Sequence, residues 1–335
     1  MSGLSFFPNR SVPASRPVFS TALRRPVFST ALRRRAVLLL PFLWFGVFLV
    51  APFLIVLKIS LAEAIIAQPP YSLLLEWQEG PAVAIRLTFR NYAFLLSDPL
   101  YLLAWLGALR IAATATAITL LLGYPMAYAI VRAPRRWRGG LLLAVILPFW
   151  TSFLIRVYAW MSLLRPNGLI NGLLLDSGLI GEPLPLLNTE FAVYLGIVYS
   201  YLPFMILPLY ATLEKLDPSL LEAAADLGCR PWRAFWRITV PLSRAGIVAG
   251  CLLVLIPAMG EVVIPELLGG PDTLMIGKVL WNEFFANRDW PVAAAVAVAL
   301  LLLLVPPLVL LMRVQEKATA RAGAAGAARR GLHDR

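Results

Sequence analysis

The sequence has few of the side chains that enzymes and metalloproteins use. Its 335 residues include two cysteines and one histidine, and only 14% of them are charged. Cys229 and Cys251 are too few for a disulfide framework. A single histidine, His333, excludes a zinc cluster or a histidine-based catalytic set. We therefore expect no catalytic residues, no cofactor and no metal site.

The sequence also lacks a phosphate-binding loop, so we do not expect it to hydrolyse nucleotide by itself. Such a loop needs Gly, four residues, and then Gly-Lys followed by Ser or Thr. At Gly277-Lys278, Val279 replaces the hydroxyl residue and Asp272 stands in place of the first glycine. Any ATP-driven work must therefore come from a separate polypeptide.

Apolar residues are what the sequence has in excess. Hydrophobic residues make up 60% of the chain, and the mean hydropathy is +0.77. Soluble domains carry about 25% charged residues, so the composition indicates an all-α, polytopic membrane protein in contact with lipid. The net charge of +12 could suggest a nucleic-acid partner. We expect none, because the positions of the charges indicate membrane orientation instead.

The long apolar runs predict six transmembrane helices. They lie at residues 36–57, 104–131, 139–164, 191–213, 245–264 and 292–312. Six spans place the N-terminus and the C-terminus on the same side of the membrane. Assigning that side to the cytoplasm puts most of the 30 Lys and Arg residues inside and most of the 18 acidic residues outside, as the positive-inside rule requires for basic residues.

The two ends of the chain are expected to be disordered. Residues 1–35 are rich in Pro, Ser and Arg, and they repeat RPVFSTALR at 16–24 and 25–33. The repeat indicates a recent local duplication. Residues 313–335 are rich in Ala, Gly and Arg. The membrane domain is therefore expected at 36–312.

One polar, arginine-bearing loop, 217–241, lies between two apolar runs. Asp217, Pro218 and Ser219 form a helix start, and Gly228 is a natural stop before a second short segment. The loop thus predicts two short amphipathic helices that join at an elbow and lie against a membrane rather than crossing it. The alternative is an ordinary interfacial helix that contacts only lipid.

This loop resembles the EAA loop of ABC-importer permeases. The family pattern is Glu-Ala-Ala, three residues, Gly, nine residues, and then Ile-x-Leu-Pro. The matching residues are Glu222, Ala223, Ala224, Gly228, Ile238 and Pro241, with Val240 in place of Leu. The resemblance implies a helix that sits in a cleft of a partner ATPase and transmits its closure to the membrane helices. Small Ala side chains allow close approach, Glu222 offers a charge, and Gly228 permits the bend.

Two carboxylates, Glu261 and Glu266, lie in the Pro- and Gly-containing segment 256–272, which is expected to be a broken helix. A charged side chain at the bilayer centre costs about 2.5–3.5 kcal/mol on insertion scales. We therefore expect Glu261 to line a cation pathway, with Glu266 as a second candidate. The alternatives are a salt bridge of Glu261, for example with Arg156, or a solvated helix end.

Aromatic side chains are further candidates for the substrate pathway. They are Trp150, Tyr158 and Trp160 in the third span, and Tyr194 and Tyr201, which share one face of the fourth. Their rings can stack on an alkylammonium group. An interfacial aromatic belt is the alternative for these residues and the commoner reason for such a pattern.

Five segments resemble the polyamine-importer permeases, especially the putrescine type. They are PFLIVLKISLAE (52–63), LPFWTSFLIRVYAWM (147–161), YLPFMILPLY (201–210), IPAMGEVVIPELLGGPD (256–272) and NEFFANRDWPVA (282–293), and the match covers roughly residues 38–312. The resemblance implies a type I ABC importer permease core (MetI-like) with an extra N-terminal helix. It also implies a bacterial inner-membrane importer with a second permease subunit, two copies of an ATPase subunit and a periplasmic polyamine-binding protein.

On this reading the chain moves putrescine, and spermidine as a further candidate, from periplasm to cytoplasm without covalent chemistry of its own. Two alternatives stay open. One is a permease of the same architecture for another solute, such as thiamine, iron or an anion. The other is a stand-alone channel or secondary transporter, for which the EAA pattern would be a coincidence.

Overall fold

The computed structural model describes residues 39, 41–72, 75–77, 83–85 and 87–333. The chain forms two compact units, Met1–Phe53 and Leu54–Arg335. The head segment that was expected to be disordered, 1–35 with its repeat, lies outside the described residues.

The described part of the chain is helical apart from one small hairpin. Strand β1 (Leu75–Trp77) pairs antiparallel with β2 (Val83–Ile85). Four helices are long and apolar enough to cross a membrane, or up to six if each of two bent helix pairs counts as one span. The predicted all-α membrane fold is confirmed.

The first apolar helix covers Pro41–Ser60, which is 20 residues long. It contains the π-helical turn η1 (Gly46–Val50) and helix α2 (Ala51–Ser60). Apolar side chains such as Trp44 and Leu49 are exposed on it. A helix that is apolar all round and unburied suits a lipid environment, because lipid chains replace the protein core around it.

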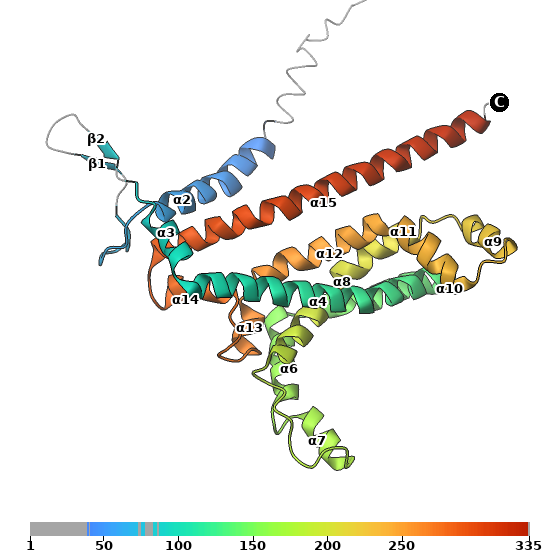
Figure 1. Cartoon of the computed structure of the whole chain (residues 1–335), viewed down its shortest axis with the longest axis horizontal. Coiled ribbons are helices and arrows are strands. Elements are labelled where there is room, and N and C mark those ends of the chain that lie inside the picture. Colours follow the sequence, from blue (N-terminus) through green and yellow to red (C-terminus); the bar gives the residue numbers. More distant parts are fainter. Residues whose placement is uncertain (1–38, 40, 73–74, 78–82, 86, 334–335) are drawn as a thin grey trace, which may run out of the picture. The chain divides into compact units, whose positions relative to one another are not determined.

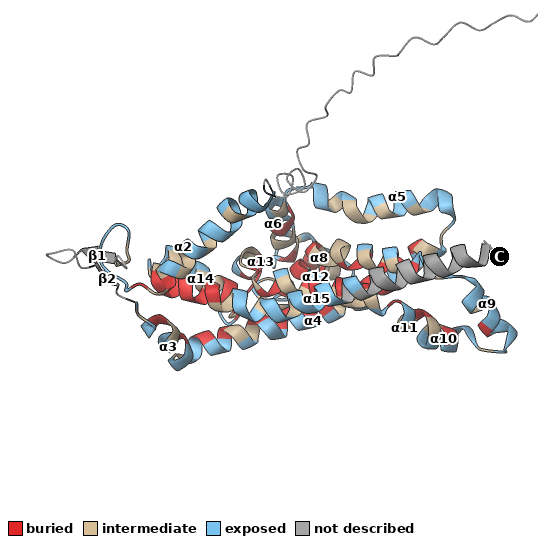
Figure 2. Cartoon of the chain, turned by 90° about the horizontal axis from the view of Figure 1, so that it is seen from above, coloured by how far each residue is buried: buried red, intermediate tan, exposed pale blue. Residues whose placement is uncertain are grey.

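Three long helices form the centre of the second unit and pack side by side (Figures 1 and 2): α4 (Pro99–Arg132), α8 (Glu190–Leu213) and α12 (Arg244–Met259). Glycines allow their close approach. A Cβ atom added to Gly123 of α4 would lie 2.9 Å from the Met205 side chain, and one added to Gly250 of α12 would lie 2.7 Å from it. Small residues at helix contacts are how membrane helices gain packing energy without a hydrophobic driving force.

The remaining helices surround this centre. Helix α14 (Ile276–Phe285) contacts the first part of α4, and α15 (Trp290–His333) packs on α12 and α14. Helix α3 (Arg90–Ser97) lies against α15 and α4. In Figure 2 the buried residues concentrate in α8, α12 and α14. The bundle therefore has an α14 end, at the start of α4, and an opposite end, where α4 finishes at Arg132.

The third predicted span, 139–164, is a bent pair rather than one straight helix. Its elements are α5 (Arg135–Ile146), the 3-10 helix η2 (Leu147–Trp150), α6 (Phe153–Leu164) and α7 (Leu169–Asp176), and the two arms are bent by 87°. Pro148 has no N–H to continue a helical ladder. Thr151 has extended backbone, and its hydroxyl donates to the Pro148 carbonyl at 2.7 Å. The break therefore falls where the backbone loses helical bonds.

The C-terminal tail differs from the sequence-based expectation. Helix α15 continues to His333, so residues 313–333 are helical rather than disordered. Ala and Arg, which fill this segment, have high helix propensity. A helix that already exists also extends without the cost of a new nucleus.

Candidate functional site

The elbow predicted in 217–241 forms as two short helices. Helix α9 (Ser219–Asp226) begins where the Asp217 carboxylate accepts a hydrogen bond from the Ser219 N–H at 3.1 Å. Helix α10 (Pro231–Ala234) starts at a proline, which lacks only an N–H that a first helical turn leaves unpaired. The local signals in the sequence thus set both helix starts.

Gly228 forms the bend between these helices with a φ of +75°. Its N–H donates to the Ala225 carbonyl at 2.8 Å, and the Cys229 N–H donates to the Ala224 carbonyl at 2.9 Å. This pair of bonds is the pattern of a left-handed helix cap, in which glycine avoids the Cβ clash that other residues meet. The spacing between the EAA residues and Gly228 therefore has a backbone cause.

The side chains of the elbow are mostly open. Glu222, Ala223 and Gly228 are exposed, while Ala224 is buried. Leu227, beside the bend, is 87% exposed. A charge, a small side chain and a leucine of the elbow are thus all open to contact.

The elbow is anchored to the bundle by aromatic packing. Helix α10 continues through the π-helical turn η3 (Phe235–Thr239) into α11 (Val240–Leu242). Phe235 lies edge-on against Tyr124 and Tyr128 of α4, with ring centroids 5.6 Å and 5.5 Å away. Ile238 and Pro241, the last residues of the EAA pattern, are half-buried in this segment. The elbow is therefore in direct contact with α4.

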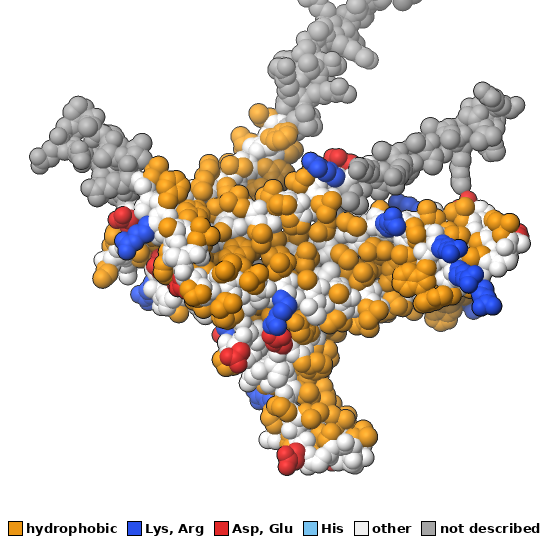
Figure 3. Space-filling view, viewed as in Figure 1, with side chains coloured by type: hydrophobic (Ala, Val, Ile, Leu, Met, Phe, Trp, Pro, Cys, Tyr) orange, Lys and Arg blue, Asp and Glu red, His pale blue; other side chains and the backbone are white. Residues whose placement is uncertain are grey.

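A cleft of about 580 Å³ opens beside α9. Its charged lining residues are Arg132, Arg135, Arg138, Glu214, Asp217 and Glu222. Arg138 and Glu214 approach to 3.8 Å, and both are partly exposed, so this pair contributes little to stability. In Figure 3 basic side chains gather at this end of the bundle, whereas its sides are largely apolar.

The second site is the break between α12 and α13 (Val263–Leu267). Helix α12 runs through Pro257 and ends at Gly260, so the glycine rather than the proline terminates it. Glu261 follows and is only 9% exposed. Its carboxylate accepts hydrogen bonds from the Val263 and Ile264 N–H groups at 3.2 Å and 3.4 Å. Glu261 thus binds the free backbone donors at the start of α13.

Tyr201 of α8 completes this site. Its hydroxyl donates to the other oxygen of Glu261 at 2.6 Å. Among the described residues no ion pair joins Glu261 to Arg156. Glu261 is buried at the helix end rather than exposed. The sequence predicts both Glu261 and Tyr201 as pathway residues, but nothing in it indicates that their side chains are in contact.

The other predicted pathway residues separate into two groups. Trp160 and Tyr194 are half-buried and pack on the main core cluster, to which Tyr201 also belongs. Trp150 and Tyr158 are 75% and 48% exposed. The structure therefore brings part of the aromatic set inward, toward the core that holds the break, and leaves two rings on the outer surface of the chain.

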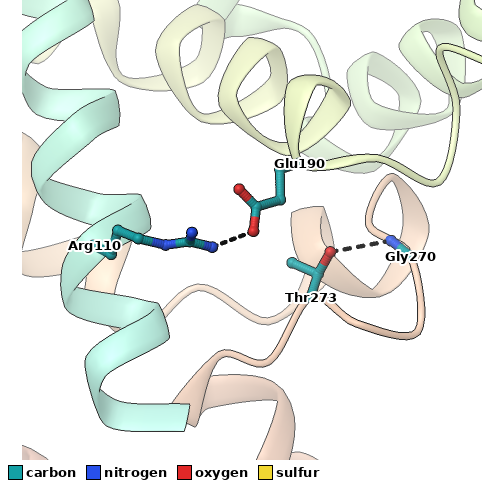
Figure 4. A network of polar contacts seen from close by, with 4 residues as sticks. All are labelled: Arg110, Glu190, Gly270 and Thr273. Carbon is teal, nitrogen blue, oxygen red and sulfur yellow. Dashed lines mark hydrogen bonds and ion pairs between the residues drawn. The ribbon is translucent and has the colours of Figure 1, made fainter. Parts of the chain in front are cut away.

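Ion pairs and hydrogen bonds at the α14 end were not expected from the sequence. Glu266, a predicted pathway residue, pairs with Lys278 at 3.3 Å. Arg110 of α4 pairs with Glu190 at the start of α8 (Figure 4). The Tyr101 hydroxyl donates to Glu283 at 2.9 Å. Glu266 and Lys278 are twelve positions apart, but the partners in the other two pairs are 80 and 182 positions apart, so only their polar character near predicted helix ends could have indicated those pairs.

Comparison with known proteins identifies the architecture. Residues 137–320 match the family described as binding-protein-dependent transport system inner membrane component, and this range includes both the elbow and the break. The spermidine/putrescine transport system permease protein PotB of Haemophilus influenzae is 46% identical over 215 residues, which is 64% of this chain and 75% of that protein. The inner membrane ABC transporter permease protein YdcU of Escherichia coli is 34% identical over 228 residues, covering 64% and 72%.

A solved structure has the same fold. A bacterial ABC transporter involved in the import of the acidic polysaccharide alginate aligns with a TM-score of 0.57 and 20% identity, over 87% of this chain and 97% of that one. At this identity the likeness concerns the fold alone. The family match and the relatives show that this chain belongs to the binding-protein-dependent inner membrane components, the permease subunits of ABC importers, in the polyamine permease family.

Proposed function

We propose that this permease subunit moves a polyamine, with putrescine as the first substrate and spermidine as the second, from the periplasm to the cytoplasm. The observation that carries the proposal is the Glu261 carboxylate, held at a helix break inside the membrane bundle by Tyr201 and two backbone N–H groups. The similarity to a spermidine/putrescine permease supports the same substrate class.

A carboxylate at this depth suits a cationic amine. Inside a membrane an acidic side chain is costly unless it meets a donor, a cation or water. Among the described residues, the donors to Glu261 are one side chain and the local backbone. An alkylammonium group adds the positive charge that the site lacks. The rings of Trp160, Tyr194 and Tyr201 are the candidate surfaces for its alkyl and ammonium parts.

The elbow is the proposed contact with the ATPase. Glu222 and Ala223 are exposed on α9, and Leu227 protrudes beside them, so a partner can cover a charge and an apolar surface together. We assign this end to the cytoplasm, because Arg132, Arg135 and Arg138 gather there and basic residues favour the cytoplasmic side. Both termini are then cytoplasmic.

The complete importer then contains a second permease, two copies of an ATPase subunit and a periplasmic polyamine-binding protein. ATP binding closes the ATPases and moves the elbows, and Phe235 passes that motion to Tyr124 and Tyr128 of α4. Glu261 is 9% exposed in this conformation. A cation therefore reaches it only after the helices around the break separate, as in hinge-driven gating.

Uptake by the reconstituted importer tests this proposal. Proteoliposomes that hold both permeases and the ATPase, with the binding protein outside and ATP inside, are supplied with radiolabelled putrescine or spermidine. We expect ATP-dependent accumulation of putrescine, with spermidine competing for entry. An ATPase variant that binds but does not hydrolyse ATP is the control for leakage.

The outcome separates the substrate from the architecture. If neither amine accumulates while the binding protein still stimulates the ATPase in the complex, the polyamine assignment is wrong and the permease assignment stands. If ATP hydrolysis does not respond to the presence of this chain at all, the coupling role of the elbow is wrong as well.

A further inference from the structure

Arg156 of α6 is a buried cation that is 8% exposed, and its Nε atom has no hydrogen-bond partner among the described residues. The guanidinium carbon lies 5.2 Å from the Phe149 ring centroid and 5.8 Å from that of Phe153. These rings hold the guanidinium in place, but they accept none of its N–H bonds in the plane of the group.

This guanidinium borders a largely apolar cleft of about 450 Å³. The cleft lies between α4, α5 and α8, and its walls include Met126, Leu141 and Leu202. No acidic side chain is part of its lining among the described residues. A buried Arg in such surroundings destabilises the protein unless it binds an anion, because burial removes the water that would otherwise accept hydrogen bonds from its N–H groups.

The depth of the cleft restricts what that anion can be. Tyr199, Leu202 and Pro203 also line it, and they lie near the middle of the 24-residue helix α8. At 1.5 Å per residue, these positions lie about 13 Å or more from the ends of the helix. A phospholipid phosphate stays at the surface of a hydrocarbon core that is about 30 Å thick. A protein side chain is not restricted in this way.

The charge of the cargo excludes another occupant. A polyamine is cationic, so it is repelled by Arg156 and cannot satisfy it. The face around the cleft also remains uncovered: Trp150 is 75% exposed and Ile155 is 66% exposed. In Figure 1 α6 and α7 project from the central bundle, and Leu169 and Leu173 of α7 are exposed as well. This apolar surface is continuous in sequence with the arm that carries Arg156.

We propose that Arg156 is the binding site for a carboxylate of the second permease subunit, which inserts between the α5–α6 arm and α8 when the two permeases associate. The guanidinium then forms two parallel hydrogen bonds with the carboxylate of an Asp or Glu. In each subunit alone, one of these two charges would be buried without a partner. The pair fixes the register of the two permeases and neutralises a positive charge inside the membrane bundle. The inference rests on the proposed function in two respects, because it requires a second permease and takes the cargo to be a cation.

The test is assembly, not transport, so it can fail or succeed independently of the polyamine assignment. The tagged chain is purified with the second permease and the ATPase, and the amount of second permease recovered per tagged chain is measured. Arg156→Glu is expected to lower recovery by at least about tenfold, because it places two like charges at one buried site. Arg165→Glu, the same change at an exposed residue of this segment, should leave recovery within about twofold.

Charge reversal in the partner identifies the carboxylate. Each acidic residue in the spans of the second permease is changed to Arg in the Arg156→Glu background, and one such pair is expected to restore at least half of the recovery. Arg156→Lys, which keeps the charge and loses the fork, should give an intermediate loss. Full recovery with Arg156→Glu, or no restoring reversal at all, overturns the proposal.

A second measurement does not depend on the variants folding. In a cryo-electron microscopy map of the unaltered complex, the group within hydrogen-bond distance of the Arg156 guanidinium should be a carboxylate of the second permease. A lipid phosphate, a small anion or water at that position instead would overturn the assignment.

Discussion

The elbow and the helix break both interrupt a helix, but the polar backbone groups at the two interruptions are hydrogen-bonded in different ways. At the elbow, Gly228 satisfies the helix end with backbone bonds alone, and Glu222 and Leu227 are left exposed. At the break, the Glu261 side chain caps the next helix, Tyr201 binds it, and the group is buried. The elbow therefore exposes side chains that a partner can cover, whereas the carboxylate at the break is buried and already hydrogen-bonded.

This difference separates the two tasks of a permease. An exposed surface on a rigid anchor can be covered by a partner and can pass on its motion. A closed carboxylate can hold a cation only after the helices around it move. The comparison predicts that changes at the elbow alter coupling without altering the fold, whereas changes at the break alter the handling of substrate.

The largest expected effect is that of Glu222→Lys. The residue is exposed, so the fold should persist, while the charge offered to the ATPase is reversed. ATP-dependent uptake in proteoliposomes should fall by more than about tenfold, and ATP hydrolysis should no longer respond to the binding protein. Glu316→Lys, the same charge change at an exposed position of α15, is the matched control. Uptake at the unaltered rate in Glu222→Lys would refute the coupling role.

The next effect is that of Glu261→Gln. The amide keeps the shape of the side chain and is easier to bury than a carboxylate, so the melting temperature should not fall. Uptake of putrescine should decrease by about five- to tenfold, because the negative charge is lost. Glu266→Gln should have a smaller effect, since Lys278 already pairs with that carboxylate. Unchanged uptake kinetics in Glu261→Gln would make Glu261 a structural residue only.

Tyr201→Phe sharpens the comparison further. It removes one hydrogen-bond donor to Glu261 and nothing else, so we expect a loss of about 1 kcal/mol in the free energy of unfolding and a raised half-saturation concentration for putrescine. Tyr194→Phe is the control, because the Tyr194 hydroxyl makes no hydrogen bond to a described side chain. Equal behaviour of the two variants in thermal unfolding and in uptake would mean that the Tyr201–Glu261 bond has no role.

The smallest effect is expected from Gly228→Ala. At a φ of +75° an alanine costs about 1 kcal/mol, and the elbow should loosen without the bundle unfolding. Gly172→Ala has open space around the added Cβ and lies within α7, so it should be neutral or stabilising by up to about 1 kcal/mol. Only Gly228→Ala should therefore lower the melting temperature, and an equal fall in both variants would contradict the cap geometry.

The sequence predicts the elbow well because its causes are local. Asp217 and Pro218 start a helix, Gly228 ends it, and a fixed spacing then leads to Ile238. Each of these acts within one or two turns, so a pattern along the chain is sufficient. The long spans at α4 and α8 are predictable for the same reason, since an apolar run of sufficient length is a local property.

The rest of the site depends on contacts that the sequence does not encode locally. Glu261 meets Tyr201 sixty positions away, and Arg110 meets Glu190 across two helices. The sequence predicts a straight third span, whereas the structure bends it by 87°. Pro148 is the residue that could have indicated this bend. Pairing between distant helices follows from their packing, and packing was not available from hydropathy alone.

The most direct test of the central claim is a crosslink from the elbow. Leu227 is 87% exposed, and Leu227→Cys in a Cys229→Ser background places one thiol at its tip. In the complete importer we predict a crosslink to the ATPase subunit whose yield changes when ATP is added. A thiol that crosslinks to no ATPase, or that is labelled only by a reagent confined to the periplasmic side, would contradict the account.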